Sequence, residues 1–321
     1  MKKHFIIPPL LIANLLAGSP EKPCIETSGL WSGDAVVTRQ DIDKILNSPS
    51  SNQEVIGTVD PANIPGIPMA PAKSVSEFLS GKHTGVDKTQ YNLFNPTPNH
   101  LLRGLSPDRP DATESPITVD AGRYQIEASL FDYRRDRGVE KFTYGQINMK
   151  AGLTHNIDLQ AVIDVRSETA GDWTTFGDLT LRLKYNLWGN DGGDTALAIM
   201  PYVIAPNRSD EWEGGIIIPW ATDLTDELSL GLQGQFDFVH DGNDHETEFL
   251  FTAVLGYPLI GNLGGYTEYI GVIAEDRYES YYSGGLTYEI NENFVLDAGV
   301  QVGLNSSSED FGLFTGFTKR F

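Results

Sequence analysis

The sequence predicts an all-β protein: a transmembrane antiparallel up-and-down β-barrel of about twelve strands, preceded by an irregular periplasmic extension. From Gly122 to Phe321 the chain reads as segments of about ten residues that alternate apolar and polar side chains, the length that a tilted strand needs to cross a bilayer. Strands of soluble domains are only about five or six residues long. Aromatic residues also recur at the ends of alternate segments, and the chain stops on a phenylalanine.

Residues 1–19 have the three parts of a secretory signal peptide. A basic start at Lys2 and Lys3 precedes an apolar run from Phe5 to Leu16, and small residues follow as far as Ser19. We expect cleavage near Ser19 and export from the cytoplasm. A short buried helix is the alternative interpretation.

Residues 20–115 hold most of the prolines and show no sustained apolar period. Two short helices are expected, one opening at Thr38 and one at Ser74, and neither is long enough to bury a core. This part is therefore predicted to be a periplasmic extension that can plug the barrel mouth, with a small independent domain as the alternative. Cys24 is the only cysteine, so it cannot form an intramolecular disulfide. The residues before it do not resemble a lipoprotein processing site, so lipidation is not expected.

Residues 116–321 are expected to form the barrel. An even number of strands returns both ends of a barrel to one side of the membrane, with short periplasmic turns and longer outer loops. The expected strands are approximately 122–133, 141–153, 157–168, 174–188, 195–206, 213–222, 228–240, 246–258, 263–274, 279–290, 294–304 and 310–321.

The apolar side chains of these segments are predicted to face lipid. Between Leu179 and Leu187 every second residue is apolar, whereas Arg182 and Lys184 lie in the other phase. An Arg or Lys at mid-bilayer on the lipid face costs about 2–4 kcal/mol, so the phase is tightly specified. A soluble two-sheet protein would turn the same apolar face toward a core. A girdle of aromatic residues near the expected periplasmic boundary favours the membrane instead: Tyr185, Trp220, Tyr257, Tyr288 and Phe321.

The last strand alternates from Phe311 to the chain end at Phe321. It resembles the terminal strand by which outer-membrane proteins of Gram-negative bacteria are recognised for insertion. This resemblance implies Phe317 and Phe321 as the insertion signal, the insertion machinery and outer-membrane lipid as partners, and the outer membrane as the location. Lys319 departs from the pattern, but at the membrane edge it can extend its ammonium group into water.

The inward phase carries charges of both signs, and these residues are the candidate pore lining. Such charges are expected to pair across a narrow lumen, because unpaired burial costs several kcal/mol per ion. Pairing favours a restricted channel for a small-molecule solute over a wide diffusion pore. The candidates are Asp164, Arg166, Asp178, Arg182, Lys184, Asp237, Glu268, Glu289 and Asp297.

The segment from Leu105 to Pro116, with Val119 to Gly122 and Gln125 to Glu127 after it, resembles the entry segment of one family. This family is the outer-membrane transporters grouped as the MetA-pathway of phenol degradation. In it a Ser-x-Asp-Arg-Pro-Asp, Thr-x-Ser-Pro and Gly-x-x-Gln-x-Glu order precedes the first strand. The resemblance covers about 105–321 and implies passage of small hydrophobic or aromatic molecules.

The charged part of this entry segment is the candidate constriction. A proline-stiffened segment that carries four charges cannot itself span lipid, so it folds into the lumen or across the mouth. The constriction candidates are Asp108, Arg109, Asp111 and Glu114. A rigid connector that only caps the barrel is the alternative.

Other classes of function find little support in the sequence. The net charge of −21 argues against nucleic acid, because phosphate contacts need an excess of Lys and Arg. No cofactor and no metal site are expected. No catalytic residue is expected either, because a barrel hydrolase needs a serine and a histidine base on its strands and only His240 comes near that position. A barrel with a closed lumen that binds or anchors a periplasmic partner through residues 20–115 is the alternative to a channel.

Overall fold

The computed structural model describes residues 87–208, 211–241 and 244–321. For residues 241, 244 and 245 it describes the backbone only. The signal peptide, Cys24 and the two expected helices lie outside these residues and stay predictions. Within the described part a 3-10 helix, η2, spans Asn99–Leu101, and no helix there is long and apolar enough to cross a membrane. The strands are β1 Tyr124–Asp136, β2 Val139–Thr154, β3 Ile157–Thr169, β4 Asp172–Thr175, β5 Leu179–Trp188, β6 Thr195–Ala205, β7 Glu213–Thr225, β8 Leu228–Asp241, β9 Asp244–Ile260, β10 Leu263–Ile273, β11 Tyr278–Asn291, β12 Phe294–Gly303 and β13 Phe311–Arg320.

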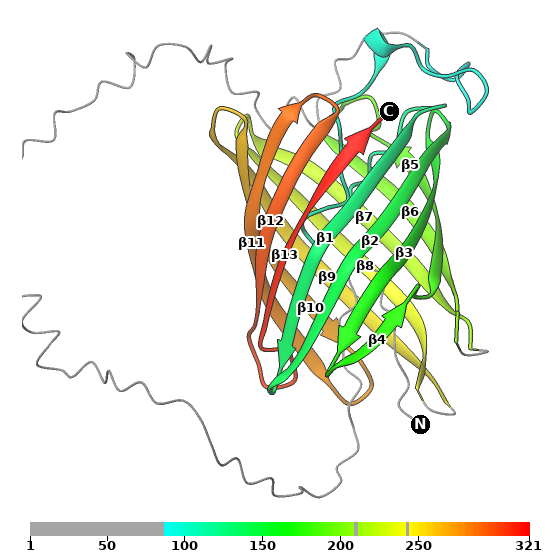
Figure 1. Cartoon of the computed structure of the whole chain (residues 1–321). Helices are drawn as coiled ribbons and strands as arrows, with labels where there is room; N and C mark the ends of the chain where they lie inside the picture. Colours follow the sequence, from blue (N-terminus) through cyan, green and yellow to red (C-terminus); the bar gives the residue numbers. More distant parts are fainter. Residues whose placement is uncertain (1–86, 209–210, 242–243) are drawn as a thin grey trace, which may run out of the picture. The chain divides into compact units, whose positions relative to one another are not determined.

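Twelve of these strands close into one antiparallel barrel (Figure 1). Neighbours along the chain pair with each other, β1 pairs with β13, and the β2–β3 pairing completes the ring. A closed barrel satisfies the backbone hydrogen bonds of every spanning strand, which the interior of a bilayer requires. The predicted fold class is confirmed.

The fourth expected strand, 174–188, is shorter than predicted. The structure divides it into β4, which pairs only with β3 in an outer hairpin, and β5, which belongs to the barrel. The division falls at Phe176, whose φ of 52° lies in the left-handed region and turns the chain out of the extended conformation.

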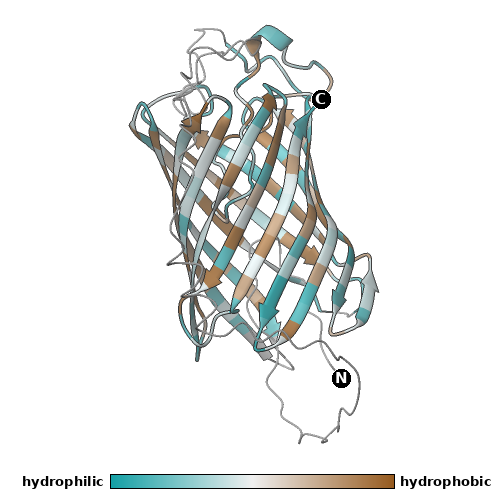
Figure 2. Ribbon diagram, turned by 60° about the vertical axis from the view of Figure 1, so that its left-hand side comes forward, coloured by the Kyte–Doolittle hydropathy of each residue, from teal (hydrophilic) through white to brown (hydrophobic). Residues whose placement is uncertain are grey.

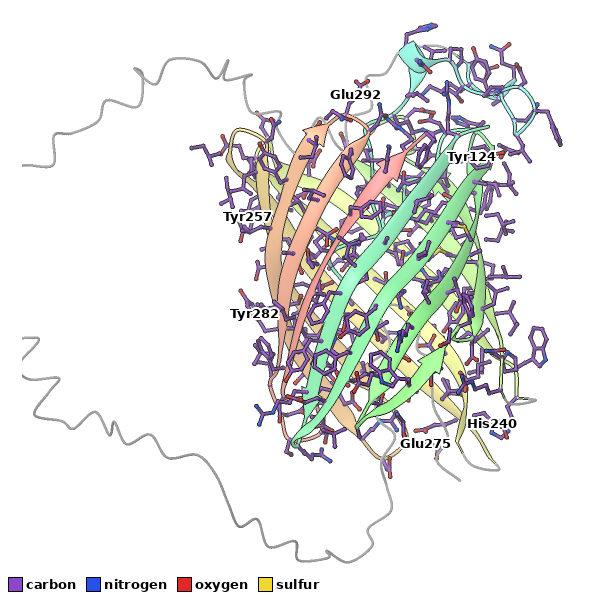
Figure 3. All side chains as sticks on the ribbon, viewed as in Figure 1. Tyr124, His240, Tyr257, Glu275, Tyr282 and Glu292 are labelled. Carbon is purple, nitrogen blue, oxygen red and sulfur yellow. The ribbon has the colours of Figure 1, made fainter. Side chains whose placement is uncertain are left out.

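The two ends of the barrel differ in their connections. The end that carries the C-terminus has tight turns, and there the Phe321 amide donates to the Tyr124 carbonyl. Figure 3 places Tyr124 and Glu292 at this end and His240 and Glu275 at the other. Because barrels have short turns on the periplasmic side, the end that carries the C-terminus is the periplasmic end.

The exterior is apolar, as the alternation predicts. Leu183 is 40% exposed, whereas its neighbours Arg182 and Lys184 are each 1% exposed. Figure 2 shows apolar residues recurring along the strands. The same phase exposes Leu232, Leu296 and other large side chains that a soluble core would bury. The prediction of a lipid-facing apolar surface is confirmed.

The rim residues at the periplasmic end lie as expected of a girdle. Tyr185, Tyr288 and Phe321 are exposed there, and the Lys319 ammonium lies 5.0 Å from the centroid of the Phe321 ring. Phe317 packs edge-on against Phe294, with 5.9 Å between ring centroids. The role of Phe317 and Phe321 as an insertion signal stays a prediction.

Leu183→Arg tests the lipid face directly. A cation at mid-bilayer costs about 2–4 kcal/mol, whereas the same change near an interface costs about 0–1 kcal/mol. We expect Leu183→Arg to lower the free energy of unfolding in lipid vesicles by that larger amount, and Leu187→Arg, near the periplasmic end, to have little effect. Urea titration measures both. Equal losses in the two variants would contradict the assigned depth.

Candidate functional site

Residues 105–120 form a polar hairpin, here called the luminal hairpin, inside the barrel. Its two arms meet where the Ser106 and Ser115 hydroxyl oxygens lie 2.6 Å apart. Its residues contact strands on different sides of the ring, among them Lys184 on β5, Thr252 on β9 and Asp297 on β12. A segment that touches strands so far apart in the ring has to occupy the lumen.

The base of the hairpin is fixed at the periplasmic mouth. Asp120 accepts a hydrogen bond from the Arg103 amide at 2.9 Å, and the Arg320 guanidinium donates to the Arg103 carbonyl at 2.7 Å. Gly152 on β2 lets this backbone come close, since a Cβ there would lie 2.0 Å from the Asp120 carbonyl oxygen. These contacts hold residues 87–103 and the hairpin base on the barrel rim.

Asp108 is the main ionic anchor of the hairpin. It is buried and forms ion pairs with Lys150 on β2 and, at 2.6 Å, with Lys184 on β5. The Lys150 Nζ atom also lies 2.5 Å from the Oε1 atom of Glu127 on β1. Burial alone would raise the pKa of Asp108, but the two ammonium groups outweigh it and hold this pKa below its ordinary value. The carboxylate is therefore charged and bound at neutral pH.

Glu114 anchors the returning arm. Its carboxyl oxygen accepts from Arg182 on β5 at 2.7 Å, and its amide donates to Gln233 on β8 at 2.7 Å. Burial and the negative charge of Asp108 raise the pKa of Glu114 to about 8, in spite of Arg182 and the nearby lysines. Glu114 therefore changes charge near physiological pH, whereas Asp108 does not.

The hairpin tip is held to the opposite wall. Arg109 donates two hydrogen bonds to Asp297 on β12, at 2.8 and 2.7 Å. Glu268 on β10 accepts from the Ala112 amide and from the Thr113 hydroxyl, both at 2.8 Å. The tip thus bridges the lumen from the β2 and β5 wall to the β10 and β12 wall.

Two separate cavities are lined in part by the same residues of the hairpin. The outer cavity, of about 70 Å³, reaches Arg134 and Tyr281 on the outer side, and the periplasmic cavity, of about 250 Å³, reaches the turn at Asn262. The residues that line both cavities are Arg109, Pro110, Asp111 and Glu114. The four residues of this boundary include three of the four constriction candidates.

The candidate pore-lining residues fall into three groups. Arg182, Lys184, Glu268 and Asp297 contact the hairpin directly, as described above. Two others are buried elsewhere in the inward phase: Asp164 accepts from Gln146, and Asp237 accepts from Gln235.

Three of the candidates lie outside this network. Arg166 is exposed and stacks 3.7 Å from the Trp173 ring centroid, where Gly145 at φ 72° interrupts the alternation of the paired strand. Asp178 is half-buried and accepts from the Asn207 amide near the outer end. Glu289 is half-buried beside the periplasmic cavity.

Lys150 and Gln233 were not among the candidates predicted from the sequence. Both are inward residues of predicted strands, so the alternation of the strands could have identified them as luminal. Lys150 shares its phase with Asn148, and Gln233 with Gln235, all four buried. Their role appears only when the depth of the hairpin is known.

The chain is similar to known proteins both in sequence and in fold. The family model described as "Putative MetA-pathway of phenol degradation" matches residues 107–321. The chain belongs to this family. The match begins within the luminal hairpin, so the hairpin and the barrel are parts of one family unit. A search of curated proteins found no match.

Several solved barrels are similar to this chain. The NanC porin has 10% identity and a TM-score of 0.46 over 61% of this chain and 98% of its own. The KdgM porin has 12% identity and a TM-score of 0.44 over 60% and 98%. An anion-selective porin from Comamonas acidovorans has 8% identity and a TM-score of 0.36 over 62% and 98%. The closed barrel with its apolar exterior places this family member in the outer membrane.

Proposed function

We propose that the barrel lets small solutes pass the outer membrane passively, through a lumen that the hairpin tip narrows. The observation that carries this proposal is that the same residues of the tip line both an outer and a periplasmic cavity. Passage down a gradient needs neither an energy source nor a cofactor. The candidates Asp108, Arg109, Asp111 and Glu114 are then the constriction.

The route runs along one side of the hairpin. The buried ion pairs of Asp108 and the hydrogen bond from Arg182 to Glu114 hold the hairpin to β2 and β5. The periplasmic cavity lies on the other side, where Gly231 on β8 and Gly264 on β10 contribute no side chain to fill it. A solute that moves between the cavities passes the tip, where Arg109 meets Asp297.

The proposed solutes are small and hydrophobic or aromatic. Ala221, Val254, Tyr266 and Val295 line the periplasmic cavity together with prolines of the hairpin. Apolar walls with a few polar groups suit small organic molecules better than sugars, which need many hydrogen-bond partners. The family description points to the same class.

Planar bilayers and proteoliposomes test this function. We expect a small, steady unit conductance, and uptake of single-ring aromatic compounds in preference to disaccharides. Empty liposomes give the background rate of membrane permeation. A silent barrel that takes up no solute and retains a periplasmic protein would replace the channel by the closed, anchoring barrel.

A further inference from the structure

The outer cavity has a polar wall that carries an arginine with only part of its hydrogen-bonding capacity filled. Arg182 is 1% exposed, lines the cavity and donates from Nη1 to Glu114. Its Nε and Nη2 atoms find no hydrogen-bond acceptor among the described residues. Two adjacent N–H groups of a guanidinium form the edge that binds a carboxylate through two parallel hydrogen bonds.

Two more polar groups line the same wall. Arg134 on β1 gives Nε and Nη2 to Asp132, at 2.8 and 2.9 Å, and its Nη1 has no acceptor within the described part of the chain. The Asn148 Oδ1 atom on β2 likewise accepts from no described donor. A buried polar atom without a partner costs about 1–3 kcal/mol, so this wall favours a polar guest.

The facing wall is largely apolar, with Glu268 and Ser283 as its polar residues. Ile270 and Val272 on β10, Tyr281 on β11 and Phe314 on β13 line the cavity and are buried. β10 and β11 lie across the ring from β5, which carries Arg182. A guest in this cavity therefore meets hydrogen-bond donors on one side and aliphatic and aromatic surface on the other.

We propose that the outer cavity is a binding site for a small amphipathic acid, whose carboxylate binds the Nε and Nη2 edge of Arg182 and whose apolar body packs on Ile270, Val272 and Phe314. The inference deepens the proposed function, on which it rests, because it names the solute class selected at the constriction. Such a site would hold the solute directly above the hairpin tip.

The acidic residues that line the cavity have partners of their own. Asp132 pairs with Arg134, Glu127 with Lys150 and Asp108 with Lys184. Glu268 accepts hydrogen bonds from the Ala112 amide and the Thr113 hydroxyl, and Asp111 also lines the cavity. The charged groups that face Glu114 are Asp108 on the hairpin, Arg182 and Lys184 on β5, and Lys150 on β2.

Glu114 also becomes neutral in the relevant range of pH. The pKa of Glu114 lies near 8, so below that pH its carboxyl group is mostly protonated and no longer offsets the charge of Arg182. Burial and the neighbouring Glu268 raise the pKa of Asp111 well above its ordinary value. Affinity for a carboxylate is therefore expected to be highest below pH 8 and to fall as Glu114 ionises.

Equilibrium dialysis of radiolabelled benzoate against the detergent-solubilised full chain at pH 7 tests the site without requiring conduction. We expect saturable binding to the unmodified protein, at least about tenfold weaker binding of the uncharged analogue benzamide, and a similar loss of benzoate affinity in Arg182→Gln. The matched control is Arg166→Gln, which removes the same charge from an exposed arginine on the outer rim. Its affinity is expected to stay within about twofold, because water and salt screen an exposed charge.

Two further variants keep the test decisive. Arg182→Lys retains the charge without the planar edge and is expected to bind benzoate more weakly, even if Arg182→Gln fails to fold. Glu114→Gln is expected to bind at least as tightly as the unmodified protein and to lose the decline above pH 8. Equal benzoate affinity in Arg182→Gln and Arg166→Gln, equal binding of benzamide and benzoate, or no saturable binding would each overturn the site. Binding without conductance would leave the site standing and refute the channel.

Discussion

Replacing residues 107–114 by two glycines is expected to raise the single-channel conductance at least about threefold, because it empties a lumen wider than the eight-stranded barrels that side chains fill. The Ser106 and Ser115 hydroxyls lie 2.6 Å apart, so a two-residue connection can join the arms without strain. The replacement removes the residues that line both cavities and leaves the barrel strands intact. Planar-bilayer recording measures the change.

The matched control makes the same eight-to-two replacement at residues 87–94. This stretch contacts the rim at Thr154 and Leu153 and contributes nothing to the boundary between the cavities. We expect the control to conduct like the unmodified protein. If the hairpin replacement also left conductance unchanged, the hairpin would be a connector and not a constriction.

Asp108→Asn is expected to release the hairpin from the β2 and β5 wall. The substitution leaves the buried ammonium of Lys184 without its carboxylate, and Lys150 keeps only Glu127. Breaking a buried pair by removing one partner costs about 3–5 kcal/mol, because the remaining charge is uncompensated. We expect a loss of that size in the free energy of unfolding in vesicles, together with fluctuating conductance.

The pH dependence of this anchor follows from the lowered pKa of Asp108. A carboxyl group whose pKa is lower in the folded than in the unfolded protein stabilises the fold at pH values above its unfolded-state pKa, which is about 3.9 for aspartate. This stabilisation is lost only as the pH falls through the folded-state pKa. The difference in stability between the unmodified protein and Asp108→Asn is therefore expected to persist from pH 8 to pH 5. Asp178→Asn, at a half-buried site near the outer end, is the control and is expected to change little. A difference that vanished by pH 6 would contradict the ion-pair anchor.

The lipid-facing surface could be predicted because the alternation of a strand leaves little choice. Leu183 and Lys184 cannot exchange faces without placing a cation in hydrocarbon, so their exposed fractions followed from the sequence. The break between β4 and β5 could not be predicted, since the left-handed conformation of Phe176 leaves no mark in an apolar pattern. Boundaries of this kind depend on how the outer hairpin packs.

The site was predictable in its residues but not in its pairings. Asp108 was a candidate from its charge in the entry segment and Lys184 from its charge and phase. Their contact joins residues 76 apart in the sequence and depends on how deeply the hairpin enters the barrel. The exposed position of Arg166 has a local cause, the positive φ of Gly145 on the paired strand. The pairing of Asp108 with Lys184, by contrast, is decided by tertiary closure of the ring around the hairpin, which no local pattern encodes.

Disulfide formation between Thr113→Cys and Thr252→Cys, in a Cys24→Ser background, measures directly whether the hairpin tip lies inside the barrel. The two threonine hydroxyl oxygens lie 2.6 Å apart, so sulfur atoms in their place come within bonding reach. We expect rapid, reductant-reversible crosslinking in isolated outer membranes, and no crosslink when either cysteine stands alone. Two thiols that stay free under oxidation and are labelled by a bulky maleimide would show that the tip lies outside the lumen.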